Sequence, residues 1–162
     1  SRLGDGLDAA IVLARDIEPT LYARRLDRNR IRPIAARALV EGPKAITHPS
    51  QLAQYSVLGH RDMADSFEIW RAALGLPDLE PVAIDLFDSG TLMLEAAAQG
   101  VGVAFMLSSH NIDPDDPRIA PLFGEPVIKS PYSYWFVCRP RALEQRPVKL
   151  FHDWLIKLID ME

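Results

Sequence analysis

The residues best placed to bind a ligand stand where a predicted strand gives way to a predicted helix. The segment Asp88–Thr91 joins an apolar strand to a helix rich in alanine. The first turn of a helix carries unpaired backbone N–H groups and a partial positive charge, and the hydroxyls of Ser89 and Thr91 would lie beside it. Ordinary capping of the helix by Asp88 or Ser89 explains the same residues equally well.

Two other predicted strands are also followed directly by segments that contain polar residues. His60 and Arg61 follow one strand, and Leu107 and Ser108 follow another. The carboxyl ends of parallel strands meet at one edge of a sheet, where ligands of α/β proteins bind. Together with Asp88–Thr91, these residues favour a site for a small anionic ligand, and Arg61 indicates a carboxylate.

Other kinds of chemistry have weaker support. The histidines are His48, His60, His110 and His152, and no two have a spacing typical of metal ligands. Ser108–His110 lacks a nucleophile-elbow motif, and we interpret it as a polar helix start after a strand. A single cysteine, Cys138, can form neither an internal disulfide nor a multi-cysteine metal site, so we expect a buried, inert thiol.

Two loop motifs also have structural explanations. Gly100-Val-Gly102 lacks the third glycine of a dinucleotide-binding fingerprint and precedes its strand, whereas the fingerprint follows one. We expect Gly100 to end a helix and Gly102 to permit close packing. The acidic loop Asn111–Pro117 lacks the glycine and the distal glutamate of an EF-hand, so we expect a solvated turn and not a calcium site.

Composition limits the functions that remain. The chain has 162 residues, of which 48% are hydrophobic and 25% charged, as is typical of a globular protein. There are 18 basic and 22 acidic residues, and the net charge of −4 argues against nucleic acid as the main partner of this segment. No apolar run is long enough to cross a membrane, and the first residues do not resemble a signal peptide. We therefore expect a cytoplasmic protein with no membrane partner and no cofactor.

The elements that must position these residues alternate along the chain. Apolar runs predict strands at Leu7–Leu13, Ser56–His60, Pro81–Phe87, Val101–Met106 and Tyr132–Cys138. Apolar spacing and capping residues predict helices at Asp65–Leu74, at Ser89–Gln99 and from about Pro147 onward. This alternation of strands and helices predicts an α/β fold with a mostly parallel sheet.

Four stretches of the chain resemble the effector-binding domain of LysR-type transcriptional regulators, particularly the branch that contains the glycine-cleavage activator and the β-lactamase regulator. They are DGLDAAIVLA (5–14), LGHRDMADSFEIWRAALGL (58–76), FDSGTLMLEAAAQGVGVAFM (87–106) and YWFVCRP with VKLFHDWL (134–140 and 148–155). The third is the most similar, with a helix, the pattern AA-x-x-G-x-G and then an apolar strand. The order and spacing of the four stretches cover nearly the whole chain.

The resemblance implies a two-lobed fold like that of the type 2 periplasmic binding proteins, with an effector held between the lobes. Residues 1–33 and 132–162 would form lobe one, and residues 34–131 would form lobe two. Lobe one would be incomplete, because its opening strand, helix and strand are missing. The winged helix-turn-helix is also missing, so DNA would be contacted only through that N-terminal domain.

The resemblance also implies which residues line the cleft between the lobes. They are His60, Arg61, Asp62, Ser89, Gly90, Thr91, Met106 and Leu107 from lobe two, and Leu13 and Arg15 from lobe one. The lobe-two positions agree with the edge that the strand ends indicate without the family. No catalytic or metal-binding residue is implied.

The leading hypothesis is a sensor domain that is not an enzyme. A small-molecule effector would bind between the lobes and change how regulator subunits pack on DNA, which requires different affinities for the two arrangements. The alternative is a solute-binding module of a transport system with the same fold. An enzyme would need a nucleophile–base pair, a metal set or a cofactor loop. An incomplete lobe leaves an open sheet edge and apolar faces, so we expect a homo-oligomer, a dimer or a tetramer.

Overall fold

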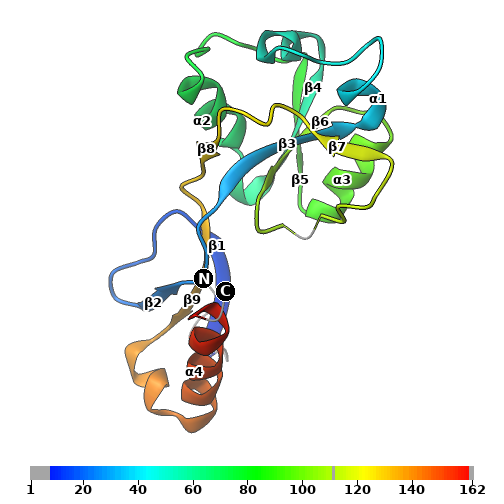
Figure 1. The fold of residues 1–162 in the computed structure, drawn as a ribbon. Helices are drawn as coiled ribbons and strands as arrows, with labels where there is room; N and C mark the ends of the chain where they lie inside the picture. Colours follow the sequence, from blue (N-terminus) through cyan, green and yellow to red (C-terminus); the bar gives the residue numbers. More distant parts are fainter. Residues whose placement is uncertain (1–7, 111, 161–162) are drawn as a thin grey trace. The chain divides into compact units, whose positions relative to one another are not determined.

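The chain forms two units, each with its own sheet and core (Figure 1). The structure is a computed structural model and describes residues 8–110 and 112–160. Unit 1 combines residues 1–28 with residues 131–162, and unit 2 is the continuous segment 29–130. The chain therefore leaves unit 1 after Arg28 and enters it again at Pro131.

The described helices include three at predicted positions and a short one, at residues 37–40, that was not predicted. They are α1 (Arg37–Val40), α2 (Ser66–Ala73), α3 (Gly90–Ala98) and α4 (Arg146–Asp160), with short 3-10 helices η1 (Pro49–Gln54), η2 (Arg61–Met63) and η3 (Pro140–Glu144). The predicted helices α2, α3 and α4 are confirmed to within one residue at each predicted end. None of the helices in the described ranges is long and apolar enough to cross a membrane.

The described sheet of unit 2 has six strands in the order β5-β4-β6-β3-β7, with β8 also paired to β3. They are β3 (Arg30–Ala36), β4 (Ser56–His60), β5 (Ala83–Phe87), β6 (Val103–Leu107), β7 (Ile119–Pro121) and β8 (Ile128–Lys129). β4 pairs in parallel with β5 and β6, whereas β3 pairs antiparallel with β6, β7 and β8. The sheet is therefore mixed. Parallel neighbours need a crossover, and only β4, β5 and β6 are joined by the helices α2 and α3.

The boundary between the units falls before β3. The lobe boundary expected from the resemblance, at residues 33 and 34, lies inside this strand, which pairs within unit 2 from Arg30 to Ala36. All of β3 therefore belongs to the second sheet.

β6 is buried along its whole length because a helix covers each face of the sheet (Figure 1). On one face, α2 packs Trp70 against Phe105, with ring centroids 5.2 Å apart. On the other face, α3 packs Met93 in a cluster with Met106. Alternate residues of β6 thus belong to two cores, which explains the unbroken apolar run in the sequence.

Gly102 precedes β6 at a point where the neighbouring backbone leaves no room for a side chain. A Cβ built on Gly102 would lie 2.5 Å from the carbonyl oxygen of Ser56. Gly100 has a φ of 81°, a left-handed conformation that is typical of a residue ending a helix. Both expectations for this motif are confirmed.

We expect Gly102→Ala to lower the free energy of unfolding by about 1–3 kcal/mol, because the backbone at the start of β4 must move to admit the methyl group. Gly124→Ala is the matched control, since a Cβ at that glycine meets nothing within 4 Å. Urea unfolding followed by circular dichroism measures both variants. Equal midpoints for the two would contradict this expectation.

The described part of unit 1 is an antiparallel sheet with one long helix packed on it. The strand order is β1-β9-β2, with β1 (Ala9–Ala14), β2 (Tyr22–Arg25) and β9 (Ser133–Cys138). This corrects the expectation of mostly parallel sheets, because β9 returns from unit 2 and runs opposite to both of its neighbours. Leu7, where the first strand was predicted to begin, lies outside the described residues.

The core of unit 1 is small and centres on β9. Phe136 and Cys138 of β9 pack with Val148 and Leu155 of α4. Burial raises the pKa of the Cys138 thiol, as expected for an inert cysteine. The opposite apolar residues of α4 remain exposed, with Trp154 at 56%.

Candidate functional site

The carboxyl ends of β4, β5 and β6 lie side by side at one edge of unit 2. His60, the last residue of β4, is in register with Phe87, the last residue of β5. Arg61 and Asp88 therefore meet just beyond the strands, with 2.8 Å between Arg61 Nε and Asp88 Oδ1. The structure thus brings together the residues that follow β4 and those that precede α3.

The first turn of α3 offers backbone donors at this edge. Ser89 caps the helix, because its Oγ accepts the N–H of Leu92 at 3.3 Å. The capping interpretation is therefore confirmed for Ser89, whereas the Asp88 carboxylate pairs with Arg61. The N–H groups of Gly90 and Thr91 have no partner within the helix. A carboxylate could accept hydrogen bonds from both of these N–H groups.

His60 is held with one ring nitrogen available as a donor. Its Nδ1 accepts the N–H of Asp62 at 3.1 Å, so a neutral ring carries its proton on Nε2. The side chain is only 15% exposed, and Asp62 Oδ2 lies 3.7 Å from the same Nδ1. These contacts orient the imidazole and direct its donor away from η2.

Met106 and Leu107 lie beneath this edge and not on its surface. Both side chains are buried. The Cε of Met106 would be 3.4 Å from a Cβ added at Gly90, so Met106 supports the start of α3. The N–H of Leu107 donates to His110 Nδ1 at 2.9 Å. That these two residues form a wall of the site stays a prediction.

The remaining predicted residues belong to unit 1. Leu13 lies in β1 and Arg15 follows it. The guanidinium of Arg15 stands over the ring of Tyr132, 5.7 Å from its centroid. That Leu13 and Arg15 contact an effector also stays a prediction.

The sequence interpretation missed Ser66. Its hydroxyl, at the first residue of α2, is the one buried side-chain polar atom without a hydrogen-bond partner in the part of the chain that the structure describes. Leaving a buried hydroxyl unpaired costs about 1–3 kcal/mol, which a bound water or ligand would offset. The signal in the sequence was the pair Asp65-Ser66, which looks like a helix cap, although Asp65 makes no capping hydrogen bond.

Ser108–His110 forms a turn, which corrects the predicted helix start. The Ser108 hydroxyl donates to Asn29 Oδ1 at 3.3 Å, and Asn29 Oδ1 also accepts the N–H of Ser109 at 3.0 Å. His110 accepts a backbone N–H from Leu107. The side chains of this segment therefore hold the end of β6 against the start of β3.

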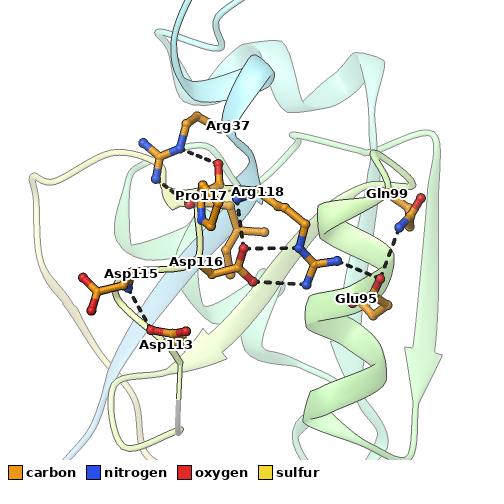
Figure 2. Close-up of polar contacts among 9 residues, drawn as sticks. Arg37, Glu95, Gln99, Asp113, Asp115, Asp116, Pro117 and Arg118 are labelled. Atoms are coloured by element: carbon orange, nitrogen blue, oxygen red, sulfur yellow. Dashed lines mark hydrogen bonds and ion pairs between the residues drawn. The ribbon is translucent and has the colours of Figure 1, made fainter.

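The acidic loop is fixed by internal contacts (Figure 2). Asp113 Oδ1 accepts the N–H of Asp115 at 2.9 Å. The guanidinium of Arg118 joins the carboxylate of Asp116, at 3.1 Å, to that of Glu95 on α3, at 2.9 Å. No group of three or more histidine, cysteine, aspartate or glutamate side chains could hold a metal ion within residues 8–110 and 112–160.

The Arg118 contacts make a pH-dependent contribution to stability. Hydrogen bonds from Arg118 hold the pKa of both Glu95 and Asp116 below their usual values. Because both values are lowered by folding, the contribution is present above about pH 4.5 and is lost as the pH falls through the lowered values. We expect Arg118→Gln to raise both pKa values, measured by NMR titration of the carboxyl carbons.

The same titration contains its own control. His152 lowers the pKa of Asp153 in unit 1, so Asp153 should titrate identically in the wild type and in Arg118→Gln. Unchanged titration of Glu95 and Asp116 in the variant would show that Arg118 does not hold them in solution.

Comparison with known proteins connects these features to named relatives. The family model described as the LysR substrate binding domain matches residues 1–159. The glycine cleavage system transcriptional activator of Escherichia coli (strain K12) is 25% identical over 158 residues, which cover 96% of this chain and 50% of that protein. The HTH-type transcriptional activator AmpR of Pseudomonas aeruginosa is 28% identical over 138 residues, covering 80% of this chain and 44% of that protein. The chain thus spans about half the length of these relatives.

Solved structures agree with the family match. The effector domain of AmpR of Pseudomonas aeruginosa has a TM-score of 0.81 and 26% identity, and the alignment covers 98% of this chain and 75% of that one. The AmpR effector binding domain from Citrobacter freundii also has a TM-score of 0.81, with 23% identity and coverage of 100% and 79%. The α/β class and the periplasmic-binding-protein-like fold are confirmed. With the family model matched from residue 1 to residue 159, the chain belongs to the LysR substrate-binding domain family.

Proposed function

We propose that this chain is the effector-sensing domain of a LysR-type transcriptional regulator and that its effector is a small anionic metabolite. One observation carries the choice of an anion: the first turn of α3, the oriented ring of His60 and the guanidinium of Arg61 converge at one edge of unit 2. All three are hydrogen-bond donors. Charge-assisted hydrogen bonds of this kind favour a carboxylate.

Asp88 is the group with which the effector must compete. Its ion pair uses Nε of Arg61, and the two side chains are 82% and 60% exposed. Exposed ion pairs contribute little to stability because water screens them. A carboxylate that also accepts N–H groups of α3 has more donors than Asp88 uses, so we expect it to take the place of Asp88 beside Arg61.

The regulatory step is a change in subunit packing. A ligand shifts an equilibrium only by its difference in affinity for the two states. β5 is the last strand of its described sheet, and the side chains of Ile84 and Leu86 in this strand, and of Val82 just before it, are exposed. This edge is a suitable surface for a second subunit. The named relatives are transcriptional activators, and none is a transport protein, so we favour the regulator over the solute-binding module.

The test is a panel of succinate, citrate, putrescine and ethylenediamine, with affinity measured by calorimetry and subunit mass by light scattering. We expect only the anions to bind and Arg61→Gln to weaken binding about tenfold, because a charge-assisted hydrogen bond is lost. Lys44→Gln is the control, since it removes an exposed positive charge away from the strand ends. Binding of the diamines alone, or equal affinities for the two variants, would contradict the proposed site.

A further inference from the structure

A cavity of about 490 Å³ lies at another corner of unit 2, along β3. β8 pairs with Arg30 and Ile31, and β7 pairs with the strand from Ile34 onward. Between these two pairings, Arg32 and Pro33 have no strand beside them on this edge of β3 and border the loop 121–127, whereas their other edge pairs with Met106 and Phe105 of β6. The volume lies in the range of about 300–1,000 Å³ that is typical of small-molecule sites.

The charged residues that line this cavity are both basic. Arg30 and Arg32 belong to the lining, and no acidic residue does. They are two residues apart on one strand, so their side chains leave the same face of β3. Two guanidinium groups on one face repel each other, and an anion between them would relieve this repulsion.

These two arginines differ from others in the same unit. Arg37 pairs with Glu41 at 2.9 Å, and Arg71 pairs with Glu80 at 3.0 Å. Within residues 8–110 and 112–160, neither Arg30 nor Arg32 has a hydrogen bond or ion pair through its guanidinium. Their charges are therefore free to bind an anion that comes from outside the chain.

The apolar wall of the cavity is preformed. The backbone of Phe123 has a φ of 53°, a left-handed conformation that residues other than glycine rarely adopt. Its ring stacks on that of Trp70, with centroids 5.7 Å apart. The N–H of Leu122 donates to the carbonyl oxygen of Pro33 at 2.9 Å. The loop is thus fixed to α2 and to β3, which lowers the entropic cost of binding.

The basic wall is fixed in a similar way. The N–H of Arg30 donates to Ser108 Oγ at 3.0 Å, and the hydroxyl of Ser108 donates to Asn29 Oδ1 at 3.3 Å. Ser108 lines the cavity, but its hydroxyl already holds the backbone of Arg30. The two guanidinium groups are therefore the donors that a ligand would use.

We propose that this cavity binds a small organic anion, with its carboxylate between Arg30 and Arg32 and its apolar body against Phe123 and Val127. This would be a second ligand site. It shares no residue with the group formed by His60, Arg61 and the start of α3, and it does not depend on the function proposed above.

Phenylacetate and its uncharged isostere phenylacetamide test the site. In an NMR titration of the whole chain, phenylacetate should shift the backbone signals of Leu122–Gly124 and Val127 and the Nε–H signals of Arg30 and Arg32. Phenylacetamide should bind about tenfold more weakly, since it lacks the charge-assisted hydrogen bonds. Arg30→Gln and Arg32→Gln should each weaken phenylacetate binding about tenfold for the same reason. Lys44→Gln, which removes an exposed charge outside the lining, should leave it unchanged.

Equal affinities for the two compounds would overturn the proposal, as would unchanged phenylacetate binding in both arginine variants. Shifts confined to residues 89–92 and abolished by Arg61→Gln would place the anion at the ends of β4 and β5 and would also overturn it. The comparison of the two compounds uses the wild type, so it decides the matter even where a variant fails to fold. If succinate and citrate fail to bind in the calorimetric test while phenylacetate binds in this cavity, that result would count against the proposed effector site alone.

Discussion

Trp70→Ala should lower the free energy of unfolding by about 3–5 kcal/mol, the usual cost of deleting a buried aromatic side chain. Trp70 is 2% exposed. Its ring lies 6.2 Å from that of Phe67, 5.2 Å from that of Phe105 and 5.7 Å from that of Phe123. Domains are stable by only about 5–15 kcal/mol, so this substitution removes a large part of the stability of unit 2.

Trp154→Ala is the matched control for this prediction. It makes the same substitution on α4 in unit 1, where the tryptophan is 56% exposed. Urea unfolding followed by circular dichroism compares the two variants, and hydrogen exchange should show faster exchange in β4 and β6 only for Trp70→Ala. Similar losses for both variants would mean that the buried aromatic cluster does not exist in solution.

Phe136→Ala should lower the free energy of unfolding of unit 1 by about 3–5 kcal/mol, again because a buried aromatic ring leaves a cavity. Phe136 is fully buried at the centre of β9. Its ring contacts Tyr22 of β2 and His152 of α4, with centroids 6.4 and 5.4 Å away, and Tyr22 Oη lies 2.6 Å from His152 Nε2. The ring of Phe136 therefore connects β2 to α4, and the core of unit 1 has few other large buried side chains to fill the space that the ring would leave.

Phe151→Ala provides the comparison in unit 1. Phe151 lies on the same helix and is 43% exposed, so its removal should cost less than half as much as that of Phe136. In hydrogen exchange, Phe136→Ala should expose the amides of β1 and β9 and leave those of β4 and β6 protected. Equal exchange in the sheets of both units would contradict separate cores.

Local pattern predicted most of the elements. The run VGVAFM predicted β6, because a strand covered on both faces is apolar at every position. Ser89 and Gly100 marked the two ends of α3, because capping and left-handed backbone depend on single residue types. The strand ends and the start of α3 in unit 2 were assigned to one edge because parallel strands joined by helices end on the same side.

Properties that depend on distant partners were decided by the tertiary structure. The direction of β3 is one: no local pattern of residues shows that this strand runs antiparallel to β6, with Ile31 opposite Leu107. Which charges are paired is another. Arg61 meets Asp88 across 27 positions of sequence, whereas Arg30 and Arg32 are left facing a cavity.

The physical reason lies in the range of the interactions. The amino-acid sequence by itself determined the periods, caps and turns that define α2, α3 and the strands, since these arise between residues a few positions apart. Only the tertiary structure decided that the loop 121–127 closes over Arg32 and Pro33, because that arrangement depends on Phe123 meeting Trp70, 53 positions earlier in the chain.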